Sequence, residues 1–139
     1  MPSKHASTRI ASNAAPAMTV SQRFFFDAAH TLQRKIQAEG SRRIHGHTYH
    51  AEVCITGPLN AATGMVIDLG LLRERLLAVR EQLDHHLLDE VPGLQQPTLE
   101  NLCLFIAQAL QDLQPPPSHV RVWRESLGDS CSLALQLSK

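Results

Sequence analysis

Two stretches of alternating hydrophobic and polar residues open the chain and predict two β-strands. The first runs from Val20 to His30 and contains three consecutive phenylalanines, and the second runs from His45 to Gly57. Alternation with a period of two is typical of strands that bury one face, and aromatic and β-branched residues favour such strands. We therefore expect the two stretches to lie against each other in one sheet.

Two stripes of hydrophobic residues with helical spacing follow these strands. The stripes consist of Leu69, Leu72, Leu76, Val79 and Leu83, and then of Leu99, Leu102, Ile106, Leu110 and Leu113. Apolar residues that recur every three or four positions predict amphipathic helices. Asp68 and Thr98 directly precede the stripes, where their side chains can cap the first helical turn. Residues 115–117, all proline, end the second helix because proline lacks an amide proton.

Two further alternating stretches complete the chain. His119 to Glu125 predicts a third strand, and Cys131 to Leu137 predicts a fourth. The order strand, strand, helix, helix, strand, strand indicates an α+β domain, with a four-stranded antiparallel sheet and two helices on one of its faces. Such a small sheet leaves two edge strands, so we expect subunits to associate through these edges and to form the active site between them.

Composition places the chain among single-domain proteins without a general affinity for polyanions. Its 139 residues suit one domain, and its 13 basic and 13 acidic side chains cancel. Residues 1–18 contain no acidic residue and predict a disordered leader, or an organellar transit peptide, ahead of a domain over 19–139. We expect no nucleic-acid or membrane partner, since no apolar run approaches a membrane span. Three cysteines without paired spacing favour the reducing cytoplasm.

Three histidines lie where the first two strands are expected to meet. His30 ends the first strand, and His45 and His47 stand two residues apart at the start of the second. In a strand, this spacing puts both imidazoles on one face. Three neutral imidazoles with an open fourth position are typical of catalytic zinc, which polarises a substrate oxygen or lowers the pKa of a bound water. The spacing alone is equally compatible with an exposed histidine pair that binds no metal.

Six motifs along the chain resemble those of the 6-pyruvoyltetrahydropterin synthase and 6-carboxytetrahydropterin synthase family. The motifs are Phe26–His30, His45–His47, Gly64–Asp68, Leu83–Leu87, Pro97–Asn101 and Val122–Ser126, in that order. The resemblance covers nearly the whole of residues 21–132. It implies the tunnelling fold, in which three subunits join their sheets into one barrel, so the partner is a second copy in a homo-oligomeric trimer or hexamer.

The resemblance also implies a role for each matching side chain. The implied zinc ligands are His30, His45 and His47, the implied acid–base pair is Asp84 and His85, and the implied pterin contacts are Glu125 and Thr98. In the pair, the aspartate orients the imidazole while the imidazole moves a proton. A glutamate carboxylate suits the guanidine-like edge of a pterin, because it accepts two charge-assisted hydrogen bonds.

The family acts on 7,8-dihydroneopterin triphosphate. One branch yields 6-pyruvoyltetrahydropterin, and the other yields 6-carboxytetrahydropterin with acetaldehyde, on the route to 7-deazapurines such as queuosine. The resemblance therefore implies a zinc-dependent lyase, and we expect the 6-carboxytetrahydropterin synthase type. Between the first two strands, a polar loop carries Arg34, Lys35, Arg42 and Arg43. These basic residues either bind the triphosphate or face solvent.

Ser41 departs from the family pattern. The synthases carry their catalytic cysteine four residues before the first histidine of the His-Gly-His motif, and this chain has Ser41 there. A thiol has a pKa of about 8.5, whereas an alcohol is far harder to deprotonate. A variant class with a glutamate three residues ahead of the pair does not fit either, since that residue is Arg42. Glu39 is the remaining carboxylate nearby.

Three explanations of Ser41 stay open. The serine is an engineered replacement, or the chain is a natural paralogue that uses Glu39 or a metal-bound hydroxide as its base, or the chain binds pterin with altered or no turnover. The intact loop around Ser41 favours a natural paralogue. The sequence therefore predicts a lyase and, as an alternative, a pterin-binding paralogue.

Overall fold

The computed structural model describes residues 16–32, 36 and 38–135. Its elements are β1 (Ala17–His30), α1 (Ala38–Arg42), β2 (His45–Pro58), α2 (Leu69–Leu83), the 3₁₀ helix η1 (Leu88–Glu90), α3 (Leu99–Ala109), β3 (His119–Arg124) and β4 (Asp129–Ala134). Among these residues, no helix is long and apolar enough to cross a membrane. The predicted order of two strands, two main helices and two strands is confirmed.

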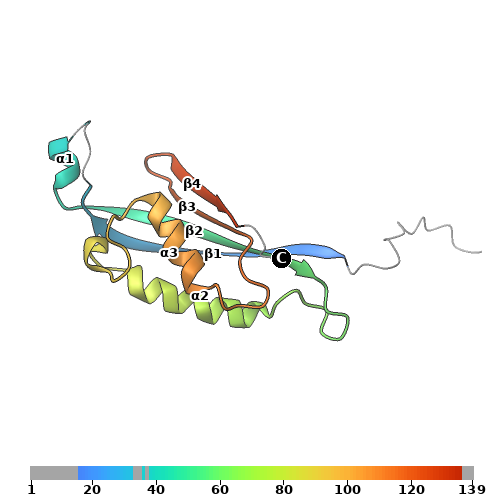
Figure 1. Cartoon of the computed structure of the whole chain (residues 1–139). Helices are drawn as coiled ribbons and strands as arrows, with labels where there is room; N and C mark the ends of the chain where they lie inside the picture. Colours follow the sequence, from blue (N-terminus) through green and yellow to red (C-terminus); the bar gives the residue numbers. More distant parts are fainter. Residues whose placement is uncertain (1–15, 33–35, 37, 136–139) are drawn as a thin grey trace, which may run out of the picture.

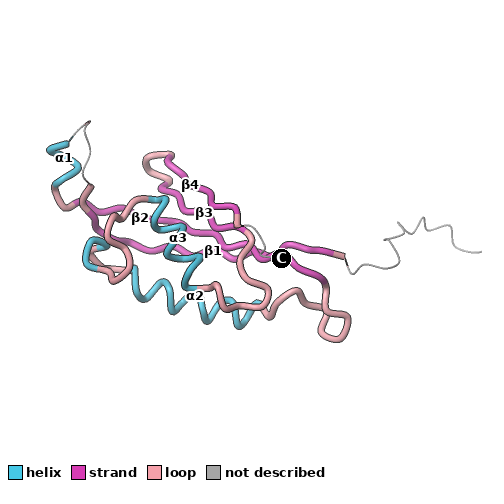
Figure 2. Tube along the Cα trace, viewed as in Figure 1, coloured by secondary structure: helices cyan, strands magenta, loops and turns pink. Residues whose placement is uncertain are grey.

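The four strands form one antiparallel sheet in the order β1-β2-β3-β4. β1 and β2 are long and pair along their whole length, from Ala17 opposite Pro58 to His30 opposite His45. Helices α2 and α3 lie together on one face of this sheet (Figures 1 and 2). The predicted α+β fold is therefore confirmed.

Several element boundaries differ from those that the sequence predicts. β1 begins at Ala17 instead of Val20, because its pairing with β2 extends that far, so Ala17 and Met18 belong to the strand and not to a leader. The remainder of the predicted leader lies outside the described residues, apart from Pro16. β3 ends at Arg124, and β4 begins at Asp129, because the two strands pair only between these residues and stop at the hairpin turn.

Both helices begin where the sequence predicts. The Asp68 side chain accepts a hydrogen bond of 2.8 Å from the amide of Gly70, and the Thr98 hydroxyl accepts one of 3.1 Å from the amide of Asn101. Each bond satisfies an amide that has no partner within the helix. The predicted stripes are largely buried, with Leu69 the exposed exception. α3 ends at Ala109, although the last two residues of its stripe stay buried beyond the helix end.

The core lies between the helices and one face of β1 and β2. Phe26 and Tyr49 pair in register and stack with ring centroids 5.0 Å apart, and both are fully buried. Since side chains alternate along a strand, the same face carries His30, His45 and His47 at the end of the strand pair. Core packing therefore fixes the face on which the three histidines lie.

The turn after α2 covers part of the outer edge of β1. The amide of His85 donates to the carbonyl of Asp27 over 2.6 Å, and the amide of Ala29 donates to the carbonyl of His86 over 3.1 Å. These bonds satisfy edge groups that would otherwise be open to pairing with another chain. They also place the residues after α2 beside the end of β1 that carries His30.

The three cysteines are all free. Cys103 is buried on α3, and burial raises the pKa of its thiol to about 12. It is therefore a packing residue and not a nucleophile.

Candidate metal centre and active site

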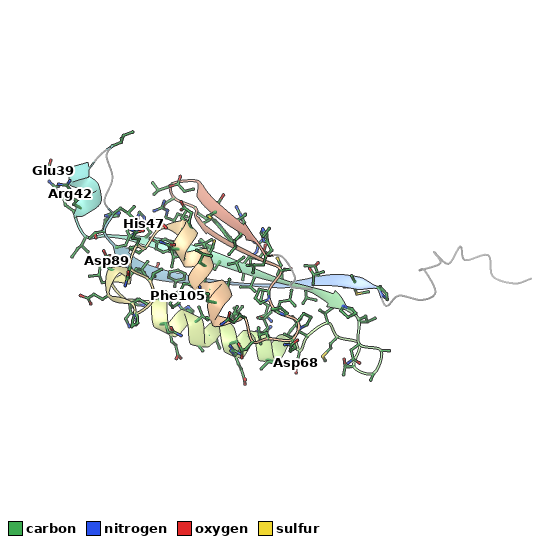
Figure 3. All side chains as sticks on the ribbon, viewed as in Figure 1. Glu39, Arg42, His47, Asp68, Asp89 and Phe105 are labelled. Carbon is green, nitrogen blue, oxygen red and sulfur yellow. The ribbon has the colours of Figure 1, made fainter. Side chains whose placement is uncertain are left out.

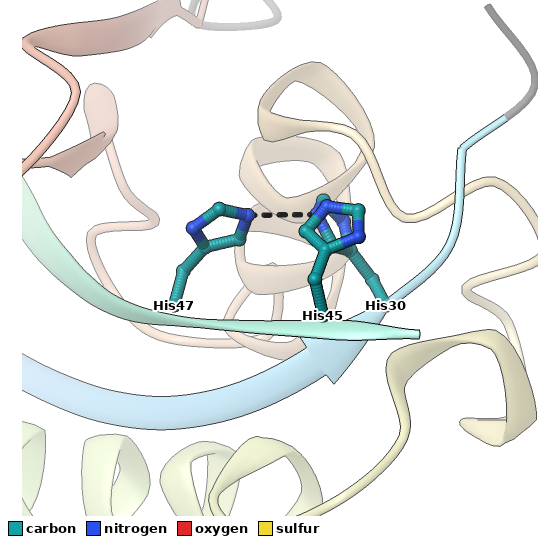
Figure 4. Close-up of side chains that lie close together, drawn as sticks. All are labelled: His30, His45 and His47. Atoms are coloured by element: carbon teal, nitrogen blue, oxygen red, sulfur yellow. Dashed lines mark hydrogen bonds between the residues drawn. The ribbon is translucent and has the colours of Figure 1, made fainter. Parts of the chain in front are cut away.

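The three predicted metal ligands meet at one end of the sheet. His30 is the last residue of β1 and pairs with His45, the first residue of β2, while His47 pairs with Ala28. The three rings gather over the end of the two strands (Figure 4), and one nitrogen from each lies within 4.8 Å of the others. This histidine triad is a group that could hold a metal ion.

Hydrogen bonds to backbone carbonyls fix two of the rings. Nδ1 of His30 lies 3.0 Å from the carbonyl of Pro97, and Nδ1 of His45 lies 2.7 Å from the carbonyl of Arg43. A carbonyl only accepts, so each Nδ1 carries the proton and each Nε2 keeps its lone pair for a metal. The Nε2 atoms of His30 and His47 lie 3.1 Å apart, close to the separation of about 3.3 Å expected for two nitrogens on a tetrahedral zinc.

The surroundings of His30 hold it neutral and in place. Its side chain is buried, and burial lowers the pKa of the imidazole, which keeps it in the form that binds metal. The next residue, Thr31, is held by Asp89, whose carboxylate accepts its amide over 2.9 Å and also its hydroxyl. Tyr49 places its hydroxyl 3.3 Å from Nδ1 of His30, and burial raises the pKa of this phenol to about 12.

The predicted acid–base pair lies in the turn after α2. Asp84 accepts the amide of Asp27 over 2.9 Å, and its other oxygen lies 2.8 Å from Nδ1 of His85 and 3.3 Å from Arg80. The hydrogen bond from Asp27, followed by those from His85 and the charge of Arg80, lowers the pKa of Asp84. The carboxylate is therefore ionised and orients the imidazole. His85 has a φ of 59°, in the left-handed region that residues with a side chain rarely adopt.

The pair and the triad do not share a face of the sheet. His85 is 79% exposed and lines a cavity of about 550 Å³ together with Asp27 and Thr48, and His47 of the triad also borders this cavity. Asp27 and Thr48 are exposed and alternate with the buried residues of β1 and β2, so they lie on the face opposite the triad. Within one subunit, the structure therefore brings the three histidines together but leaves His85 on the other side of the strands.

A second cavity lies beside the triad. It has a volume of about 620 Å³, and its lining includes His30, Thr98, Arg124 and Asp129. Thr98 thus both caps α3 and lines the cavity that the triad borders. Its predicted contact with a pterin ring stays a prediction.

Glu125, the other predicted ligand contact, does not line this cavity. It is exposed, and its carboxylate accepts the indole N–H of Trp123 over 2.9 Å. The neighbouring residue, Arg124, lies in the cavity instead, with its whole side chain nearly buried. The sequence indicates this position of Arg124, because strand alternation puts Arg124 on the same face as Val120 and Val122.

The loop that carries Ser41 forms the short helix α1. Ser41 lies in α1, and its side chain is outside what the structure describes, as are Arg34 and Lys35. Glu39 is 91% exposed and lies 3.9 Å from Arg43. Figure 3 shows Glu39 at the outer end of the molecule, away from His47. The structure does not place Glu39 at the triad.

The fold and the triad together define a candidate metalloenzyme whose ligands lie on the ends of two paired strands. Residues 19–134 match the family model described as 6-pyruvoyl tetrahydropterin synthase. The chain belongs to this family. The predicted family is therefore confirmed.

Named relatives span several activities. The chain is 34% identical to a 6-carboxy-5,6,7,8-tetrahydropterin synthase of Synechocystis, over 69% of this chain and 77% of the relative. It is 30% identical to a dihydroneopterin monophosphate aldolase of Pyrococcus furiosus, over 81% and 90%, and 33% identical to the human 6-pyruvoyl tetrahydrobiopterin synthase, over 69% and 76%. The expectation of an enzyme of the 6-carboxy- or 6-pyruvoyl-tetrahydropterin synthase type is confirmed at this level.

A solved structure supports the fold independently. The structure of Caenorhabditis elegans 6-pyruvoyl tetrahydropterin synthase matches with a TM-score of 0.77, at 22% identity, over 88% of this chain and 99% of that one. At this identity, the match concerns the arrangement of the elements alone.

Proposed function

We propose that this protein is a zinc-dependent lyase of the 6-carboxytetrahydropterin synthase type, acting on 7,8-dihydroneopterin triphosphate on a route to 7-deazapurines such as queuosine. The observation that carries the proposal is the histidine triad, whose Nε2 atoms converge while carbonyls hold Nδ1 of His30 and His45. The similarity to the Synechocystis synthase supports the choice of reaction type.

His30, His45 and His47 would hold the metal. Zinc bound there would polarise the hydroxyl oxygens of the substrate side chain and acidify the neighbouring C–H bonds. The protein's own contribution is to keep His30 neutral and to orient the rings of His30 and His45 before substrate arrives. Burial of His30 and the carbonyl partners of His30 and His45 support this role.

Asp84 and His85 would move a proton on the substrate. Because Asp27 and Thr48, which line the cavity with His85, lie on the sheet face opposite the triad, we propose that a neighbouring copy supplies the pair, in a trimer or hexamer. His85 is exposed, and Asp84 already orients its ring. A residue that acts on a substrate held by another subunit needs both properties. We also propose that the protein acts in the cytoplasm.

The predicted pterin contacts differ in how the structure supports them. Thr98 lies in the cavity beside the triad, and we keep it as a contact of the pterin ring. Glu125 lies outside that cavity and is bonded to Trp123. Glu125→Gln decides its role: an unchanged KM would remove Glu125 from the substrate site, and a raised KM would show that the ring binds from the exposed face.

Ser41 favours the second candidate function, a pterin-binding paralogue with altered or no turnover. Incubation of zinc-loaded protein with 7,8-dihydroneopterin triphosphate, followed by mass spectrometry, separates the two. Formation of 6-carboxytetrahydropterin and acetaldehyde supports the lyase. Binding without product supports the paralogue, and restoration of turnover by Ser41→Cys would place the difference on that one side chain.

A further inference from the structure

A buried cation lies in the cavity beside the triad. Arg124, the last residue of β3, is 6% exposed and lines this cavity. One of its terminal nitrogens donates to Asp129 over 2.8 Å, and the other lies 3.5 Å from Nε2 of His47. Its Nε is buried and has no hydrogen-bond partner among the described residues. Most buried polar groups are paired, so this unpaired donor calls for an explanation.

Metal binding would leave Arg124 with fewer hydrogen-bond partners and a cation nearby. When Nε2 of His47 binds a metal, it no longer offers a lone pair to Arg124, and a divalent charge comes close to the guanidinium. Like charges repel strongly where burial limits solvent screening. Asp129 offsets only part of the charge, since it contacts one nitrogen and is half exposed. An anion lying against Arg124 near the metal would satisfy the unpaired Nε and offset the repulsion.

We propose that Arg124 and the triad form one subsite for an oxyanion, either a phosphate group of the substrate or the carboxylate of the product. Nε and Nη2 of an arginine present two parallel donors, which match the oxygens of either group. Here Nη2 donates to Asp129, so the anion would take the unpaired Nε and compete with that carboxylate for Nη2. The inference rests on the proposed function for the presence of the metal. This subsite changes the expected orientation of the substrate. The positively charged Arg124 would repel the guanidine-like edge of the pterin ring but attract an anionic group, so we expect the anionic group to lie at Arg124.

The test measures zinc affinity by competition with a chelator, with sulfate or acetate as probes and perchlorate holding the ionic strength constant. Sulfate stands for a phosphate group and acetate for a carboxylate. An anion that binds both Arg124 and the metal must tighten zinc binding, by about tenfold at saturation. The probe with the larger effect identifies which of the two groups binds.

Arg124→Gln is the main variant, and Arg121→Gln is its matched control. Arg121 lies on the same strand but faces the other side of the sheet, where it stacks over Trp123 at 4.4 Å. We expect Arg124→Gln to bind zinc more tightly than the parent protein without sulfate, since a repelling charge is gone, and to lose the sulfate effect. Arg121→Gln should behave as the parent does. A sulfate effect that survives in Arg124→Gln would overturn the proposal.

A second variant and a metal-free measurement probe the same subsite. Asp129→Asn removes the competing carboxylate from the exposed start of β4, so it should enlarge the sulfate effect severalfold. An unchanged effect would contradict the subsite. In the metal-free protein, sulfate should raise the melting temperature of the parent and of Arg121→Gln more than that of Arg124→Gln, which keeps only the general stabilising effect of sulfate. This arm needs neither zinc nor pterin. Failure of the lyase assay alone therefore leaves the subsite standing, and absence of the sulfate effect in both arms refutes it.

Discussion

The histidine triad and the Asp84–His85 pair lie at the same end of the sheet, on opposite faces and in opposite surroundings. His30 is fully buried and its ring is bonded to the carbonyl of Pro97, which precedes α3. His85 is 79% exposed and stands in a left-handed turn that is bonded to the edge of β1.

This difference separates two ways of preparing a side chain for chemistry. The triad is completed within one chain, because strand register brings the ligands together and carbonyls fix their tautomers. The pair is oriented within one chain, but its imidazole meets no reacting group there. Disruption of the first should therefore remove the metal, and disruption of the second should remove turnover while the metal stays.

The largest expected effect comes from His45→Ala. The loss of one of three ligands should weaken zinc binding by on the order of a thousandfold, roughly a third of the binding free energy of a zinc site, and turnover should fall to background. Metal analysis of the purified variant measures this. The matched control is His50→Ala, which lies on the other face of β2 and stacks on Trp123. Full retention of zinc by His45→Ala would refute the triad.

The next effect in size comes from His85. His85→Ala should lower turnover about a hundredfold through loss of the proton-transferring group, with unchanged zinc content. His85→Gly should be equally inactive but about 1 kcal/mol more stable than His85→Ala, because glycine adopts the φ of 59° without strain. Steady-state rates and urea unfolding separate these two outcomes. Wild-type turnover in His85→Ala would exclude the imidazole from the reaction.

A smaller effect should follow from Tyr49→Phe. The Tyr49 hydroxyl lies 3.3 Å from Nδ1 of His30, a ring already bonded to Pro97, so it adds a supporting contact. Its loss should weaken zinc binding about fivefold, the equivalent of about 1 kcal/mol for one hydrogen bond. Chelator competition measures the affinity, and thermal unfolding of the metal-free protein is the control. Lower stability with unchanged zinc affinity would make Tyr49 a packing residue only.

Most of the triad's surroundings could be predicted from the sequence, because they depend on local patterns. Alternation in β1 and β2 sets the face of each histidine, and Asp68 and Thr98 mark the helix starts through hydrogen bonds that span two or three residues. Such interactions need no knowledge of the remaining fold.

The cavity and the pair depend on distant contacts and could not be predicted in the same way. Strand alternation puts Arg124, and not Glu125, on the face of the cavity, but His30 and Thr98, which also line the cavity, come from distant parts of the chain. The position of His85 follows from pairing with the edge of β1, about sixty residues away in the chain. A motif match names these residues without indicating the face on which they lie.

The smallest effect is the acid sensitivity that Asp84 contributes. The amide of Asp27, with His85 and Arg80, holds the pKa of Asp84 below its usual value of 3.8. Above about pH 4, Asp84 is ionised in both folded and unfolded protein, and its stabilising contribution is complete. As the pH falls below this value, the unfolded chain takes up the proton first, so that contribution declines. Asp84→Asn has no such dependence.

The stability difference between the parent protein and Asp84→Asn should therefore be largest above pH 4 and narrow as the pH falls towards 2. Urea midpoints over this range measure it. Glu74→Gln, on the exposed side of α2, serves as the control and should follow the parent at every pH. Parallel curves for the parent and Asp84→Asn would mean that the hydrogen bond to Asp27 needs no charge. The turn would then be held by its backbone bonds to β1, and Asp84 would serve His85 alone.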